Sequence, residues 1–168
     1  MEQAIRIARI SDDSVHVATL AEWAHGEWGH LHPERSLDTA IAVFRTECGS
    51  GGVPTVFAAL HADVPIGMAS LVADDMSDRR DLTPWLASVY VLPAWRGRGI
   101  ASQLVRRVEE EACAHGHGKF YLYTPDQQAL YRRLGWHALE DREYRGERVT
   151  IMYRTFAESR SCWFPGSA

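Results

Sequence analysis

The residues with the clearest chemical potential lie directly after a short β-forming run that ends at Pro93. Glycines at 97 and 99 allow the backbone there to approach a ligand without interference from Cβ atoms. The N–H groups of such a turn, with the unpaired N–H groups that begin a helix, form a binding site for an anion. Two neighbouring arginines can add charge-assisted hydrogen bonds to phosphate oxygens. The sequence therefore predicts a diphosphate cradle built by Arg96, Gly97, Arg98, Gly99, Ile100, Ala101 and Ser102.

Two common nucleotide-binding patterns are incomplete at this cradle. A P-loop needs Lys followed by Ser or Thr after its last glycine, whereas this sequence has Ile100-Ala101. A dinucleotide-binding fingerprint would place a third glycine at Ser102 and an acidic residue about 20 positions later at a strand end. The next expected strand, 119–123, contains no acidic residue. Both nucleotide hypotheses are therefore weakened, and competition between ATP and coenzyme A would test them.

The cradle and a second segment together resemble the GCN5-related N-acetyltransferase (GNAT) family. The family signature has Arg or Gln, two residues, Gly, one residue, and then Gly or Ala, after a strand ending in Val-x-Pro. Arg96, Gly99 and Ala101 occupy those positions, and Val91-Leu92-Pro93 precedes them. The second family region ends in Leu-Tyr-x-x-x-Gly-aromatic, which matches residues 130–136.

The resemblance implies a GNAT fold, an α/β fold with helices on both faces. Its mixed, mostly antiparallel sheet would have about six to seven strands and would be splayed between the fourth and fifth strands. In such enzymes the pantetheine arm of acetyl-CoA lies in this gap as a pseudo-strand, a form of β-augmentation. An amine attacks the thioester directly in a ternary complex, and no metal takes part. The residues implied to contact acetyl-CoA, besides the cradle, are Val89, Tyr90, Val91, Thr124 and Tyr131.

Tyr131 is the predicted catalytic residue, because it matches the family's tyrosine that donates a proton to the leaving sulfur. A core tyrosine on a short helix is the plainer alternative. Leu130 and Leu134 already form an apolar stripe at i, i+4 spacing, and Tyr131 projects about 100° away from Leu130. That spacing favours the catalytic assignment.

The general base has no clear candidate. Many relatives carry a glutamate where this sequence has Ala87. Glu22, Glu27, His25 and a water chain near Ser88 remain as alternatives. The missing glutamate keeps a second hypothesis open, a non-catalytic domain that senses acetyl-CoA or binds a partner. Thr124 replaces a common asparagine, so its hydroxyl could cap a helix rather than contact the cofactor.

Histidines and tryptophans offer weaker hints. No cysteine or His-Glu-x-x-His pattern supports a metal site at His25, His30 and His32, so a solvated or substrate-lining loop is favoured. The family's first helix and its loop wall the acceptor pocket. Three tryptophans could therefore line that pocket or pack in the core, namely Trp23, Trp28 and Trp85. The acceptor, a small-molecule or peptide amine, is left open.

The supporting elements follow from hydrophobic spacing. We expect strands at 4–10, 55–61, 64–74, 85–92, 119–123, 136–144 and 147–155. We expect helices at 12–25, 36–48 and 99–115, and a short one opened by a capping box at 124–127. No linker or repeat interrupts the pattern, so residues 1–156 should form one acetyltransferase domain and 157–168 a peripheral tail. Trp163 and Phe164 in that tail could pack on a second subunit, which would make a homodimer.

Bulk properties exclude several classes of protein. A net charge of -4 over 168 residues argues against binding to nucleic acid. No apolar run approaches the roughly 20 residues that span a bilayer, and the first residues do not resemble a signal peptide. The three cysteines are odd in number and widely spaced, so we expect no disulfide framework. A cytoplasmic enzyme is the resulting expectation.

Overall fold

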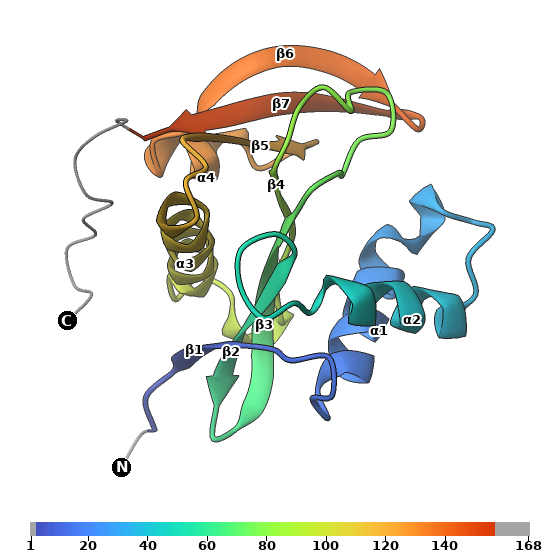
Figure 1. Cartoon of the computed structure of the whole chain (residues 1–168), viewed down its shortest axis with the longest axis vertical. Helices are drawn as coiled ribbons and strands as arrows, with labels where there is room; N and C mark the ends of the chain where they lie inside the picture. The colour runs from blue at the N-terminus through green and yellow to red at the C-terminus, as the bar shows by residue number, and fades with distance from the viewer. Residues whose placement is uncertain (1–2, 157–168) are drawn as a thin grey trace.

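The computed structural model describes residues 3–156, which form a seven-stranded sheet in the order β1-β2-β3-β4-β5-β7-β6 (Figure 1). Neighbouring strands are antiparallel except for β4 and β5. The strands are β1 (Arg6–Arg9), β2 (Thr55–His61), β3 (Val64–Val72), β4 (Trp85–Val91), β5 (Lys119–Thr124), β6 (His137–Tyr144) and β7 (Glu147–Thr155). The helices are α1 (Val17–Trp28), α2 (Leu37–Glu47), α3 (Ile100–Ala114) and α4 (Gln128–Arg133), with 3-10 turns η1 (Gly29–Leu31) and η2 (Pro93–Trp95). The predicted α/β fold is confirmed.

Helices cover both faces of the sheet, because the central strands are apolar on both sides. On β2, Phe57 faces a core cluster that includes Leu104 and Val108 of α3. Its neighbour Val56 faces a second cluster that includes Leu20 of α1. Figure 1 shows α3 and α4 on one side of the sheet and α1 and α2 on the other. This burial on both faces explains why β2 has a continuous apolar run rather than an alternating one.

The sheet splays between β4 and β5, as the family resemblance implied. These two strands share a single paired position, Trp85 with Tyr121, at the start of β4. The adjacent backbone bond runs from Tyr121 N to Pro84 O at 3.1 Å. Beyond this point no β4–β5 pairing occurs in the described part of the chain. The strands therefore diverge toward the end of β4, where the cradle begins.

The expected boundaries hold closely for most elements and fail at two helix starts. Helix α1 begins at Val17 rather than near Asp12, because Ser14 Oγ accepts a hydrogen bond from His16 N within a separate turn. Helix α4 begins at Gln128, after a turn capped by Thr124. By contrast, α2 begins at Leu37, close to the expected start, and Ser36 caps it by accepting from Thr39 N at 3.1 Å.

The expectations for the cysteines, for a membrane-spanning helix and for the C-terminal tail have different outcomes. Cys48 is a buried free thiol, whereas Cys113 is disulfide-bonded. The expectation that the cysteines form no disulfide is therefore wrong, and the compartment inferred partly from it stays a prediction. No helix within residues 3–156 is long and apolar enough to cross a membrane. The predicted tail, with Trp163 and Phe164, lies outside the described residues.

Candidate active site

A cavity of about 890 Å³ opens where β4 and β5 separate. Its walls come from β4, the segment after it, β5 and α4, and, facing these, from α1, η1 and α2. The structure brings almost all of the predicted cofactor-contacting residues to this cavity and leaves out Arg98. Those that line it are Val89, Tyr90, Val91, Arg96, Gly97, Gly99, Ile100, Ala101, Ser102, Thr124 and Tyr131.

The cradle has the geometry that an anion requires. Gly97 and Gly99 adopt left-handed φ values of 76° and 77°, which residues with a side chain rarely adopt. A Cβ at either glycine would meet no protein atom within 4 Å, so the space above the turn is open. The first helical bond joins Gln103 N to Gly99 O at 3.1 Å. The N–H groups of residues 100–102 therefore have no helical partner and remain available to a diphosphate.

The side chains of the two cradle arginines make different contacts. The Nε of Arg96 donates to Val91 O at 2.9 Å, and its guanidinium lies 5.5 Å from the Tyr90 ring centroid. This bond fixes the turn to the end of β4 while Arg96 still lines the cavity. The guanidinium of Arg98 instead lies 4.8 Å from the Trp95 ring centroid, outside the cavity wall. Of the pair, Arg96 is therefore placed to meet a phosphate.

A β-bulge interrupts β4 in the cavity wall. Tyr90 pairs with Met68 and Ala87 with Ser70, so two residues of β4 stand opposite one residue of β3. Ser88, in the bulge, has a φ of 54°, a strained conformation for a serine. The regular pairing with β3 is interrupted only at Ser88 and Val89, both of which line the cavity. A bulge here therefore leaves backbone groups free to pair with an extended ligand.

Tyr131 lies in the cavity wall and is 7% exposed. Its ring meets Trp136 edge-on at 6.1 Å between centroids. Burial raises the pKa of the Tyr131 phenol above its ordinary value, and the charge of Asp126 adds to this effect. No residue between 3 and 156 hydrogen-bonds to its hydroxyl group. The phenol is therefore held protonated, as a proton donor must be.

Thr124 has a structural role that the sequence anticipated in part. Its hydroxyl accepts from Gln127 N at 3.0 Å and from Asp126 N at 3.4 Å, so it caps the turn before α4. The expected reciprocal bond from the Gln127 side chain, which would complete a capping box, does not form in the described region. The threonine also lines the cavity, and its contact with the cofactor stays a prediction.

Two carboxylates that sequence reasoning missed line the cavity, Glu47 at the end of α2 and Asp75 in the β3–β4 loop. Burial raises the pKa of Glu47 to about 7, against the opposing charge of Arg35. Burial also raises the pKa of Asp75 well above its ordinary range, and the charge of Glu47 adds to this. No local pattern marks either residue, because one ends an ordinary helix and the other lies in a polar loop.

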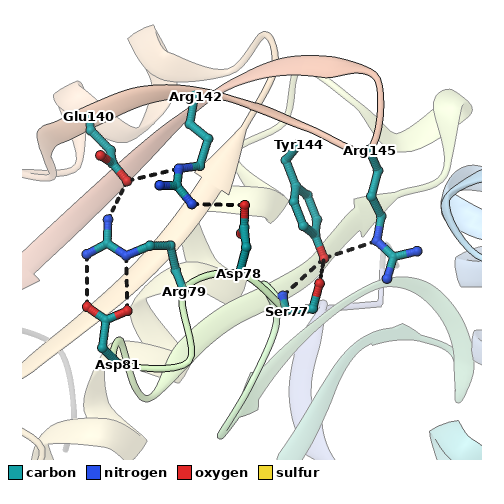
Figure 2. A network of polar contacts seen from close by, with 8 residues as sticks. All are labelled: Ser77, Asp78, Arg79, Asp81, Glu140, Arg142, Tyr144 and Arg145. Carbon is teal, nitrogen blue, oxygen red and sulfur yellow. Dashed lines mark hydrogen bonds and ion pairs between the residues drawn. The ribbon is translucent and has the colours of Figure 1, made fainter.

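A polar network fastens the β3–β4 loop, which carries Asp75, to strand β6 (Figure 2). The Tyr144 hydroxyl accepts from Ser77 N at 3.2 Å and from Arg145 Nε at 3.1 Å. Arginines and carboxylates form the rest of the network, through Asp78, Arg79, Asp81, Glu140 and Arg142. The loop is therefore held to β6 at Ser77 and at residues that follow it.

The same hairpin also holds the loop after α1. Arg145 Nη1 donates to Leu31 O at 2.6 Å, and His30 Nε2 lies 3.0 Å from Glu147 Oε1. Segments that are far apart in the sequence therefore meet at the rim of the cavity. These contacts bridge η1 and the β6–β7 turn on the side of the cavity opposite the cradle.

Only some of the candidate bases and tryptophans line the cavity. Glu27 and His25 line the cavity, whereas Glu22 does not. Trp28 also lines it, but Trp23 packs on Tyr90, at 5.6 Å between ring centroids, and stays outside the wall. Trp85 is fully buried against β5. No group of three potential metal ligands occurs among residues 3–156.

Comparison with known proteins agrees with this geometry. The model of the acetyltransferase (GNAT) family matches residues 17–136, and the chain therefore belongs to that family. The structure of yncA from Salmonella typhimurium with its cofactor acetyl-CoA is similar, with a TM-score of 0.69 at 21% identity over 98% of this chain and 99% of that one. The predicted family and its general activity, acetyl transfer, are confirmed at this level.

Two further solved structures share the fold. NAA60 from Arabidopsis thaliana, in complex with a bisubstrate analogue, has a TM-score of 0.67 at 15% identity, covering 93% of this chain and 100% of that chain. An aminoglycoside 6'-acetyltransferase type Ii has a TM-score of 0.68 at 18% identity, covering 89% and 96%. At such identities the likeness establishes the fold alone.

Proposed function

We propose that this protein transfers the acetyl group of acetyl-CoA to a primary amine by direct attack within a ternary complex. The observation that carries the proposal is one continuous cavity. It joins the cradle at Gly97 and Gly99 to Tyr131 and then to the space walled by α1 and α2. A cavity of this extent can hold both substrates together, so no acetylated enzyme needs to form.

Acetyl-CoA, when bound, would supply a thioester carbonyl and a thiol leaving group whose pKa is about 8.5. The N–H groups at the start of α3 and the guanidinium of Arg96 would hold the diphosphate. The bulged backbone at Ser88 and Val89 would orient the extended arm. Tyr131 would hold a proton for the departing sulfur, because burial keeps its phenol un-ionised. These residues position the ligand and supply the proton.

Thiol release from acetyl-CoA, measured across a panel of amines, tests the proposal. Tyr131→Phe should lower kcat by about 100-fold or more, the usual range for loss of a general acid. The Kd for coenzyme A should stay unchanged, because the ring still fills its place. Tyr153→Phe is the matched control, since this β7 tyrosine lies outside the cavity wall.

The replacement of the family's glutamate by Ala87 supports one other candidate, a domain that binds acetyl-CoA without turnover. Tight binding of coenzyme A with no thiol release for any amine would favour that candidate. An unchanged kcat in Tyr131→Phe would remove Tyr131 from the mechanism.

A further inference from the structure

The end of the cavity away from the cradle is acidic. The cradle follows the last residue of β4, whereas the final β3–β4 pair, Val72 with Trp85, lies at the other end of that strand. Asp75 comes three residues after Val72 and therefore lies beyond the start of β4. Glu47 reaches the same cavity from the end of α2. The two carboxylates thus stand on the acceptor side, opposite the diphosphate site.

Neither carboxylate has a partner in the described chain. No hydrogen bond or ion pair reaches the side chain of Glu47 or Asp75, and Arg35 acts on Glu47 only through its charge. Both residues are half-buried, and desolvation raises the pKa of each carboxyl group where it lines the cavity. An ionisable group that lines a cavity without a partner and has a raised pKa is typical of a binding or catalytic site.

Among the described residues, the two buried glutamates of α3 contact hydrogen-bond donors or arginines. Glu109 accepts from Trp136 Nε1 at 3.1 Å and lies 3.3 Å from Arg154 Nε. Glu111 accepts from Gly52 N at 2.9 Å and contacts Arg9 at 2.8 Å. Each of these glutamates therefore has a partner on at least one carboxylate oxygen, although Glu109 Oε2 has none among the described residues. Glu47 and Asp75 differ from them, because both line the cavity and neither carboxylate is paired within residues 3–156.

The surroundings favour an organic cation as the missing partner. The rings of Trp28 and Tyr123 line the same cavity and can face an ammonium group. A metal ion is a poorer fit, because no third acidic, histidine or cysteine ligand joins the pair within residues 3–156. An alkyl ammonium needs only charge and a few acceptors, which two carboxylates supply.

We infer that Glu47 and Asp75 bind the ammonium group of the acceptor, which is therefore a cationic amine, and that this pair accepts the proton that the ammonium must lose. The inference rests on the proposed function. The freed lone pair forms the bond from nitrogen to the acetyl carbon as the carbon–sulfur bond breaks. Tyr131 gives its phenol proton to sulfur, and the second proton lost from nitrogen replaces it.

The protonation state of the pair is consistent with this role. The pKa of Glu47, at about 7, lies close to neutral pH, where a general base exchanges protons most effectively. The charge of Arg35 opposes protonation of Glu47, and the charge of Glu47 in turn helps to raise the pKa of Asp75. A bound ammonium would favour the ionised carboxylate, so binding near pH 7 should release part of a proton.

Calorimetric titration of the full chain with 1,4-diaminobutane, in the presence of coenzyme A, tests the inference without turnover. Repeating the titration at pH 7 in two buffers of different ionisation enthalpy counts the protons released. The intact protein should bind the diamine with proton release and should not bind butan-1-ol, its neutral counterpart. Glu47→Gln and Asp75→Asn should each weaken diamine binding by roughly tenfold or more. Glu47→Gln should also reduce the proton release.

Controls separate this inference from the proposed function. Glu22→Gln makes the same change of charge outside the cavity and should leave diamine binding unchanged. The Kd for coenzyme A should be equal in all variants. If coenzyme A fails to bind the intact protein, the proposed function fails. If coenzyme A binds but the diamine does not, or binds equally well to Glu47→Gln and Asp75→Asn, the acidic pair is not the acceptor site.

Discussion

The unpaired carboxyl of Glu47 should make the stability of the fold depend on pH. Its pKa rises from an ordinary 4.5 to about 7 because folding buries it. The folded state therefore holds this proton more tightly than the unfolded chain does. The resulting contribution is fully present below about pH 4.5 and is lost as pH rises through 7. Glu47→Gln, which cannot ionise, should escape that loss.

The size of the effect follows from the same pKa values. A change from 4.5 to about 7 corresponds to roughly 3 kcal/mol at high pH. Because Glu47 is partly accessible from the cavity, solvent reduces this to about 1–2 kcal/mol. For a chain of this length, each kcal/mol shifts Tm by about 2–4 °C. Glu47→Gln should therefore melt roughly 3–6 °C above the parent protein at pH 8.5 and at the same temperature at pH 4.

Thermal denaturation of the parent protein and of Glu47→Gln between pH 4 and pH 8.5 measures this difference in Tm. The difference in Tm should be near zero at the acidic end and should grow through neutrality. Glu22→Gln, at an exposed position on α1, should show no such growth. A Tm difference for Glu47→Gln that is independent of pH would show that folding does not raise the pKa of this carboxyl.

Three other substitutions test separate parts of the structure. Gly99→Ala adds a methyl group to the open cradle and should weaken coenzyme A binding by about tenfold or more in calorimetry; Gly116→Ala, with a similar φ and equally open space, should not. Gly135→Ala would place its Cβ 1.9 Å from an arginine on β7 and should lower Tm by about 4–10 °C, whereas Gly146→Ala, in open space, should lower it far less. Tyr144→Phe removes the contacts between the Tyr144 hydroxyl and Ser77 of the β3–β4 loop and should raise the KM for amine without changing the Kd for coenzyme A.

The diphosphate cradle could be predicted because its parts are consecutive. Gly97 and Gly99 form a turn, the following residues begin a helix, and the backbone groups proposed to bind the phosphates are close in sequence. Helix α3 was predicted within one residue at each end, since its apolar stripe of Ile100, Leu104 and Val108 is buried as expected. Local geometry of this kind depends little on the rest of the fold.

Helix starts were less predictable where several residues could act as caps. Asp12, Asp13 and Ser14 all have the side chains of N-cap residues. The backbone instead turns there, and α1 begins after His16 without a side-chain cap. Burial of Val17 and Leu20 against the sheet determines where the helix lies, and that packing has no local signature.

The sequence alone determined the family, and it predicted where the cofactor's phosphates would bind and which tyrosine would donate a proton, because each of these depends on short motifs with fixed spacing. The acceptor end was decided only by the tertiary structure. Glu47 and Asp75 are separated by two strands of the sheet, and each lies in an unremarkable local context. They share a cavity because the sheet places the end of α2 and the β3–β4 loop beside the gap between β4 and β5. Within residues 3–156 no side chain pairs with either carboxylate, and such a lack of partners depends on the tertiary packing rather than on the local sequence.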